Sequence, residues 1–240
     1  MTGTEPPPPP EPPHERRPRD SEARGVRLVP SLLVLTVVSG LIDAVSYLGL
    51  GHVFTANMTG NVVVLGFAAA GAPGFSIPHT ATSLAFFLAG AASGGRLVRR
   101  PGGGSRRRWT RVTLAAEAVL LAGASAVAFA TAEHDRHRIY AVIALTAFAM
   151  GLRNATVRKL AVPDLTTTTV VTMPLTGLAS DSRAGGGSGH GSPRRTAAVV
   201  AMFAGAVLGA ALVLHQDIAA PLLLAAVMSG VLAVTVSGRE

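Results

Sequence analysis

Polar side chains interrupt one of the most apolar regions of the chain, the stretch "GLIDAVSYLGLGHVFTANMTGN" at residues 40–61. It holds the carboxylate of Asp43 and, further along, the amides of Asn57 and Asn61 with the hydroxyl of Thr59 between them. Such groups can hold a proton, a cation or a polar solute by accepting and donating hydrogen bonds. In lipid they are costly unless they are paired or hydrated, so they indicate a functional site. We therefore expect them to line a polar cavity.

The composition places these residues in a membrane protein. Of 240 residues, 49% are hydrophobic and only 14% are charged, and the mean hydropathy is +0.43, which is too apolar for an ordinary soluble domain. The chain has no cysteine, which excludes disulfides, thiolate metal sites and cysteine nucleophiles. The scattered histidines show no metal-ligand spacing, and we expect no cofactor.

The apolar runs define the elements that must position the polar groups. A crossing helix needs about 20 mostly apolar residues, and the sequence predicts six of them, at 28–50, 80–97, 109–132, 139–160, 196–215 and 219–237. Two further runs, 53–72 and 165–180, are rich in Thr or Asn and carry Gly, with Pro174 inside the second. We expect these two runs to be discontinuous or re-entrant. Residues 1–27, rich in Pro and Arg, predict a disordered cytoplasmic tail.

The distribution of basic residues supports six crossings. The net charge of +8 would suggest nucleic acid in a soluble protein, but here the charge is almost all Arg, lies between apolar runs and lacks interleaved aromatic residues. If all eight runs cross, the 21 Lys and Arg divide 11 to 10 between the two sides. If only six cross and both termini are cytoplasmic, 19 lie inside, as the positive-inside rule requires. We therefore expect no nucleic-acid partner.

Three matches in the same order indicate an internal repeat. They pair "GLIDA" at 40–44 with "GLRNA" at 151–155, "VFTANMTG" at 53–60 with "VVTMPLTG" at 170–177, and "LAGAASG" at 88–94 with "FAGAVLG" at 203–209. Chance matching of Ala and Gly is the alternative. With three crossings in each half, at 28–132 and 133–240, the second half runs opposite to the first, as in transporters whose broken helices meet near the midplane. The predicted fold is an all-α integral membrane protein built as an inverted repeat.

The same residues carry a resemblance to a known family. "GLIDAVSYLGLGHVFTANMTGNVVVLG", "GLRNATVRKL" and "TTTTVVTMPLTGLASDS" resemble the YoaK family of bacterial membrane proteins, a family of unknown function, over roughly residues 28–237. The resemblance implies a multi-pass protein of the bacterial cell membrane. It implies no substrate and no catalytic residue.

Two carboxylates and two polar clusters are the candidate sites. We expect Asp43 to bind a proton or a cation; the alternative is a hydrogen-bonded structural residue, since its repeat partner Asn154 is neutral. Glu117 is a second candidate for binding a proton or a cation, and the alternative is a side chain packed near the Arg111 end of its helix. The Asn and Thr groups face their repeat counterparts across the midplane, or else hold helices together. The candidate substrate- or ion-binding residues are Asp43, Asn57, Thr59, Gly60, Asn61, Glu117, Asn154, Thr172, Thr176 and Gly177.

These observations favour a transporter or channel-like protein for an unidentified small solute, with a polar midplane site between the repeats. The alternative is a noncatalytic membrane scaffold that binds a partner. We expect no enzyme, because no nucleophile has an adjacent base. The expected partners are the lipid bilayer and a small solute or proton, and a homo-oligomer is left open. Arg153, Arg158 and Lys159 are expected to be headgroup anchors.

Overall fold

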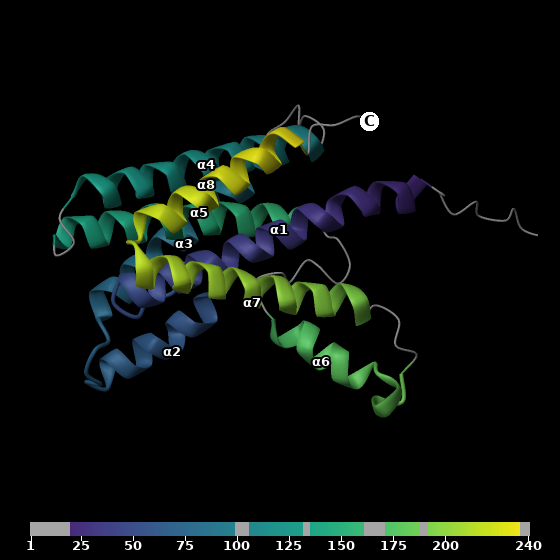
Figure 1. Cartoon of the computed structure of the whole chain (residues 1–240), viewed down its shortest axis with the longest axis horizontal. Helices are drawn as coiled ribbons and strands as arrows, with labels where there is room; N and C mark the ends of the chain where they lie inside the picture. The colour runs from purple at the N-terminus through teal and green to yellow at the C-terminus, as the bar shows by residue number, and fades with distance from the viewer. Residues whose placement is uncertain (1–19, 99–105, 132–134, 161–170, 188–191, 236–240) are drawn as a thin grey trace, which may run out of the picture.

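The apolar runs form helices in the computed structural model, which describes residues 20–98, 106–131, 135–160, 171–187 and 192–235 (Figure 1). These residues contain eight α-helices, one short 3-10 helix and no strand. The α-helices are α1 (Asp20–Gly49), α2 (Met58–Ala69), α3 (Ile77–Val98), α4 (Arg106–Ala130), α5 (Arg136–Leu160), α6 (Thr172–Ser180), α7 (Ser192–His215) and α8 (Ala219–Thr235), and the 3-10 helix η1 is Arg183–Gly185. The expectation of an all-α protein is confirmed for the described residues.

The first helix begins earlier than predicted. α1 starts at Asp20, whereas the tail was expected to run to residue 27. The segment after Asp20 contains Glu22, Ala23 and Arg24, which are residue types with good helix propensity. The rest of the predicted tail lies outside the described residues.

Four helices of the described chain are long and apolar enough to cross a membrane. The crossing segments are Pro30–Gly49, Arg108–Ala130, Arg136–Lys159 and Pro193–His215. α8 is apolar but has only 17 residues, about 25 Å at 1.5 Å per residue, and α3 is not among the four. The count of six crossings therefore stays a prediction.

The two ambiguous runs form short helices. α2 has 12 residues and α6 has nine, so they span about 18 Å and 14 Å. A straight helix of either length is too short for a hydrocarbon layer of about 30 Å. The part of the second run before residue 171 lies outside the described residues.

Three long helix pairs make the body of the molecule: α1 packs on α7, α3 on α5, and α4 on α8. Glycines let two of these pairs approach closely. A Cβ at Gly205 in α7 would overlap the carbonyl oxygen of Val37 in α1, and a Cβ at Gly151 in α5 would overlap that of Phe87 in α3. Small residues at helix contacts are the usual means of close packing in membranes.

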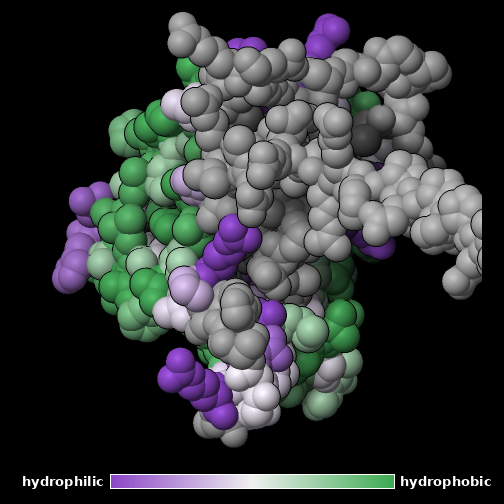
Figure 2. Space-filling model, turned by 90° about the vertical axis from the view of Figure 1, so that its right-hand side faces the viewer, coloured by the Kyte–Doolittle hydropathy of each residue, from purple (hydrophilic) through white to green (hydrophobic). Residues whose placement is uncertain are grey.

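The long helices have their ends at two faces, and α2 and α6 pack on the sides of the bundle (Figure 1). α1, α4 and α7 end where α3, α5 and α8 begin, and we call this face the Gly49 end. Large apolar side chains are exposed along the helices, among them Val119, Phe129, Phe203 and Leu214 at 70–87% exposure. Figure 2, which views the molecule from the face opposite the Gly49 end, shows hydrophobic residues gathered over its flank. An apolar outer surface of this extent fits a protein surrounded by lipid.

Candidate functional site

Asp43 holds the connection between α1 and α2. Its side chain lies in α1 and is only 6% exposed. Its Oδ1 accepts hydrogen bonds from the backbone N–H groups of Ala56 at 2.9 Å and Asn57 at 3.2 Å. These amides precede α2, where the chain has no helical partner for them. The structure therefore gives Asp43 a capping role, in agreement with the structural alternative for this residue.

Asn57 and Asn61 also stabilise the connection between α1 and α2, by hydrogen bonds to its backbone and to the first turn of α2. Asn57 is the N-cap of α2, and its Oδ1 accepts from the N–H of Gly60 at 3.3 Å. Asn61 is fully buried; its Oδ1 accepts from Phe54 N–H at 2.8 Å, and its Nδ2 donates to Phe54 O at 2.6 Å and to Ser83 Oγ at 3.0 Å. Thr59 is exposed. The polar groups of this stretch thus satisfy the backbone of an irregular loop in an apolar environment.

Replacing Asp43 by alanine tests this capping role. The Asp43→Ala variant leaves the buried amide of Ala56 and the half-buried amide of Asn57 without an acceptor. An unsatisfied buried amide costs about 1–3 kcal/mol. We expect a lower unfolding temperature in detergent and faster hydrogen exchange at Ala56 and Asn57. Asp43→Asn keeps one acceptor oxygen and is the matched control, with a smaller effect. Unchanged exchange in the alanine variant would contradict the capping role.

The candidate residues of the second half lie elsewhere. Asn154 is half-buried in α5, and Thr172 and Thr176 are exposed on α6. Gly177 is half-buried, and its carbonyl accepts a hydrogen bond from Arg195 Nη1 at 2.9 Å. The expectation that this cluster faces the Asn57 cluster is wrong for the described residues, because α2 packs on α3 while α6 packs on α7 and the two short helices do not touch. The physical reason is that each short helix buries its side against its own neighbour along the chain.

A partly buried ion pair fixes the end of α6. Arg195 in α7 donates to the carboxylate of Asp181, which follows α6. This hydrogen bond, together with one from Ser180, holds the pKa of Asp181 below its usual range. The pair ties α6 to α7 at the face opposite the Gly49 end.

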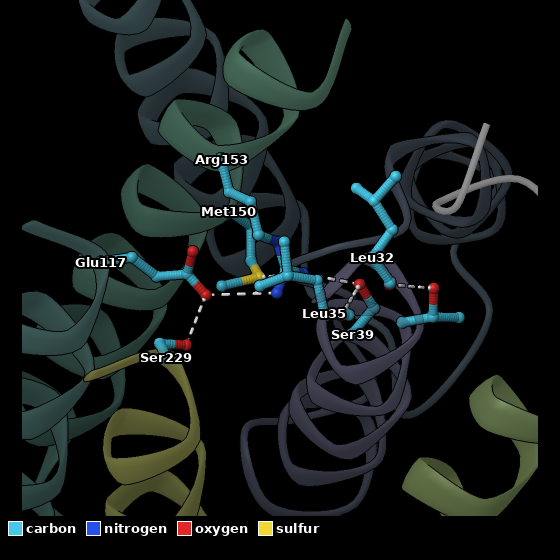
Figure 3. Close-up of polar contacts among 8 residues, drawn as sticks. Leu32, Leu35, Ser39, Glu117, Met150, Arg153 and Ser229 are labelled. Carbon is cyan, nitrogen blue, oxygen red and sulfur yellow. Dashed lines mark hydrogen bonds and ion pairs between the residues drawn. The ribbon is translucent and has the colours of Figure 1, made fainter. Parts of the chain in front are cut away.

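A buried ion pair lies where four helices meet (Figure 3). Arg153 of α5 is 2% exposed and Glu117 of α4 is fully buried, and Arg153 Nη1 donates to Glu117 Oε1 at 3.2 Å. Arg153 Nη2 donates to Ser39 Oγ of α1 at 2.6 Å, and Ser229 Oγ of α8 donates to Glu117 Oε1 at 2.9 Å. We call Ser39, Glu117, Arg153 and Ser229 the charged layer. Its polar groups join helices from both halves of the chain.

The charged layer lies deep in the bundle. Glu117 is 11 residues from the start of α4 and 13 from its end, and Ser39 is ten residues before the end of α1. At 1.5 Å per residue both lie about 15–20 Å from the nearer helix ends. The expectation that Arg153 is a headgroup anchor is wrong, since it is buried about 10 Å before the end of α5. Arg158 and Lys159, nearer that end, are exposed.

Apolar clusters lie on both sides of the charged layer. The cluster toward the Gly49 end includes Leu41, Val45, Leu121, Val142 and Leu222, all at most 1% exposed. The cluster toward the opposite face contains Leu32, Leu35, Leu114, Val157, Ala198, Leu232 and Ala233. The ion pair is therefore enclosed between two apolar barriers.

One carboxylate oxygen of the charged layer has no partner. Glu117 Oε1 takes both hydrogen bonds, while Oε2 is buried and has no hydrogen-bond partner among the described residues. Arg153 is also within electrostatic range of Asp43. A buried oxygen left unpaired beside a charged partner is costly, so its presence calls for a chemical reason.

A cavity lies at the Gly49 end, beyond the apolar cluster that contains Leu41 and Leu222. It has a volume of about 270 Å³ and is lined by Gly49, Arg138, Ile139, Val213, Gln216, Asp217 and Ile218. Arg138, which is 3% exposed, donates from Nη2 to both oxygens of Asp217 at 2.7 and 3.0 Å. The cavity thus opens between the ends of α1 and α7, the start of α5 and the connection that follows α7. Among the described residues no group of three His, Asp or Glu side chains could hold a metal.

Comparison with known proteins places the chain in a family. The model of the family described as "Protein of unknown function (DUF1275)" matches residues 31–235, which include all four residues of the charged layer. The chain belongs to the DUF1275 family. A relative in Bacillus subtilis (strain 168), "UPF0700 transmembrane protein YoaK", is 35% identical over 154 residues. This confirms the resemblance to the YoaK family.

The match to the relative is partial. It covers 63% of this DUF1275 chain and 64% of the relative, so the chain spans somewhat under two thirds of the relative's length. No solved structure matches. The relative's description as a transmembrane protein and the four long apolar helices agree that this is a membrane protein.

Proposed function

We propose that this protein is a membrane transporter for a small solute, with the charged layer as its central site. The observation that carries the proposal is the buried Arg153–Glu117 pair, held by Ser39 and Ser229 from two further helices. Ionisable residues at membrane depth are costly, and they are typical of substrate and ion pathways. The polar groups around α2 support the fold of the site's surroundings in this proposal, and the solute binds at the charged layer.

An inverted repeat accounts for the location of the site. α1 packs on α7 through Gly205, and α5 packs on α3 through Gly90 and Gly151. Gly90 and Gly205 are the same glycine of the "AGA" match, at an offset of 115. Each short helix packs on the long helix that follows it, α2 on α3 and α6 on α7, as expected of two equivalent halves. Glu117 and Ser229 meet where α4 packs on α8. In such architectures the substrate site lies at the interface of the two repeats.

The proposed topology has six crossings in the bacterial cell membrane, with both termini cytoplasmic. The positive-inside count supports it, because 18 of the 21 basic residues then lie inside, two lie outside, and Arg153 belongs to the charged layer. The Gly49 end then faces outward, and the cavity beside Arg138 is the outer approach to the charged layer. The apolar clusters on both sides close the path, so the structure corresponds to an occluded state of the proposed transporter. No enzymatic activity is proposed.

One observation favours a scaffold as the second candidate. Asp43 and Asn61, which first suggested a cavity, are satisfied by the backbone of residues 54–57. A scaffold predicts that the charged layer is equally static, with its groups satisfying one another in a dry core. The unpartnered Oε2 of Glu117 favours the transporter, because a purely structural ion pair gains from satisfying both oxygens.

Cysteine accessibility distinguishes the two candidates, since the chain contains no cysteine of its own. Ser39→Cys and Ser229→Cys report on the charged layer, and Ser180→Cys and Pro73→Cys are exposed controls. Each variant is labelled with an impermeant thiol reagent in right-side-out and inverted vesicles, with and without a pH gradient. We expect Pro73→Cys to react from outside and Ser180→Cys from inside.

The transporter predicts that Ser229→Cys or Ser39→Cys changes the side from which it is labelled as the gradient is reversed. If both stay unreactive from both sides while the controls are labelled, the transporter proposal fails and the scaffold stands. If both controls react from the same side, the six-crossing topology is wrong.

A further inference from the structure

We propose that the charged layer binds a small monovalent anion at Arg153 together with a proton at Glu117, so that the two are carried as a neutral pair. This rests on the proposed transport function and names its substrate class and coupling ion. It starts from three features of the site: one guanidinium, one carboxylate with a free oxygen, and enclosure by apolar clusters.

The free oxygen is the place for the proton. Glu117 Oε1 accepts from both Arg153 and Ser229, and Oε2 has no partner among the described residues. A hydronium ion can transfer a proton to Oε2 without displacing either hydrogen bond. One O–H bond of the hydronium ion breaks as the O–H bond to Oε2 forms, water leaves, the carboxylate becomes a carboxylic acid, and the charge of the layer rises by one.

Protonation of Glu117 removes the negative charge that neutralises Arg153. Its remaining contacts, with Ser39 Oγ and Met150 Sδ, are neutral. A buried cation without a counter-charge is strongly disfavoured. An anion from the outer cavity replaces the lost carboxylate charge, and a single negative charge restores neutrality, which selects a monovalent species over a divalent one. The tight apolar surroundings select a small one.

The groups around Glu117 do not offer a substitute for this anion. Asp43 of α1 lies within electrostatic range of Arg153, but its Oδ1 is held by the amides of Ala56 and Asn57. α8 faces Glu117 with Ser229, which is neutral. The charged or titratable side chains described on α3, His79 and Arg96, lie at its two ends. When Glu117 is ionised, its own charge neutralises Arg153 and repels an incoming anion, so the anion enters with the proton.

Infrared spectroscopy tests this without measuring transport. The purified full chain in nanodiscs is titrated with acid, and the carbonyl band of a protonated carboxyl group is followed. We expect a transition that Glu117→Gln abolishes and that Asp181→Asn, which removes an exposed carboxylate far from the layer, leaves in place. Ser229→Ala removes one hydrogen bond to the carboxylate and is expected to move the transition to higher pH, so the assignment does not depend on the Gln variant alone.

The anion is tested by linkage. Chloride, nitrate and formate are each compared with gluconate, a much larger monovalent anion, at equal ionic strength. Because coupling is reciprocal, an anion that binds the protonated state tenfold more tightly moves the transition upward by one pH unit when it saturates the site. We expect a shift of that order for at least one of the three, and none in Arg153→Gln.

Two results overturn the proposal: no transition assigned to Glu117, or a transition that none of the three anions shifts. These results are distinct from failure of the proposed function. If the linkage is present but the cysteines of the charged layer never change sides, the chain binds a proton and an anion without transporting them.

Discussion

Replacing Arg153 by methionine is expected to destabilise the bundle by about 3–5 kcal/mol, because it leaves the fully buried carboxylate of Glu117 without its cation. The guanidinium also holds Ser39 of α1, so the variant loosens the contact between α1 and α5. Thermal unfolding and denaturant titration of the detergent-solubilised protein measure the loss. The effect is large because the cost of the unpaired charge adds to the lost hydrogen bonds.

The matched control is the double replacement Glu117→Met with Arg153→Met. It removes both charges and fills the layer with side chains of similar volume, so most of the lost stability is expected to return. A double-mutant cycle separates the coupling of the pair from the effect of each substitution. If Arg153→Met alone matched the wild type in stability, the pair would not be formed in the folded protein, and the proposed central site would fail with it. Recovery of stability without recovery of anion binding would show that the pair serves function more than folding.

The class of the protein and most of its helices could be predicted from the sequence, because long apolar runs allow few structures in lipid. The short extent of α2 was also visible, in the Asn and Gly residues that precede a plain apolar run. The sequence does not distinguish Arg153 from Arg158 and Lys159, because charge counting treats all basic residues near a helix end alike. Whether an arginine five residues before Arg158 turns inward depends on a carboxylate 36 positions earlier in the chain, and only the packing of α4 on α5 brings the two together.

Some residues of the candidate site could be predicted from the sequence, but most of their partners could not. Asp43, Asn57 and Asn61 lie in one stretch of 19 residues, so their proximity follows from the sequence, but most of their partners are backbone groups. Backbone partners leave no trace in the pattern of residue types. Glu117 was identified as a buried carboxylate from hydropathy alone, while Ser39 and Ser229 were not, since isolated serines are common in membrane helices.

Replacing Gly151 or Gly205 by alanine is expected to destabilise the protein through helix separation. At each position the new Cβ would overlap a backbone carbonyl of the partner helix, Phe87 O or Val37 O, and a backbone cannot move aside as a flexible side chain can. Overpacking of a tight interior costs about 1–3 kcal/mol, and the separation of whole helices extends the effect along the contact. Unfolding temperatures in detergent measure it.

Gly66 and Gly123 provide matched controls within helices. A Cβ at either position meets nothing within 4 Å, so alanine there is expected to be neutral or to stabilise by about 0.5–1 kcal/mol through its higher helix propensity. Equal stability of Gly151→Ala and Gly123→Ala would contradict the close approach of α3 and α5.

Alanine substitutions at equivalent glycines also test the proposed inverted repeat. Gly90 and Gly205 are equivalent under the repeat, and a Cβ at each meets a backbone carbonyl, that of Phe148 or Val37. If α3 with α5 and α7 with α1 descend from one packing arrangement, Gly90→Ala and Gly205→Ala lose similar stability, and the double variant loses about the sum, since the two contacts belong to separate helix pairs. A large loss at one glycine and none at the other would mean that the two pairs are held by unrelated interactions. The charged layer would then lie between dissimilar halves, and alternating access by exchange of equivalent conformations would lose its structural basis.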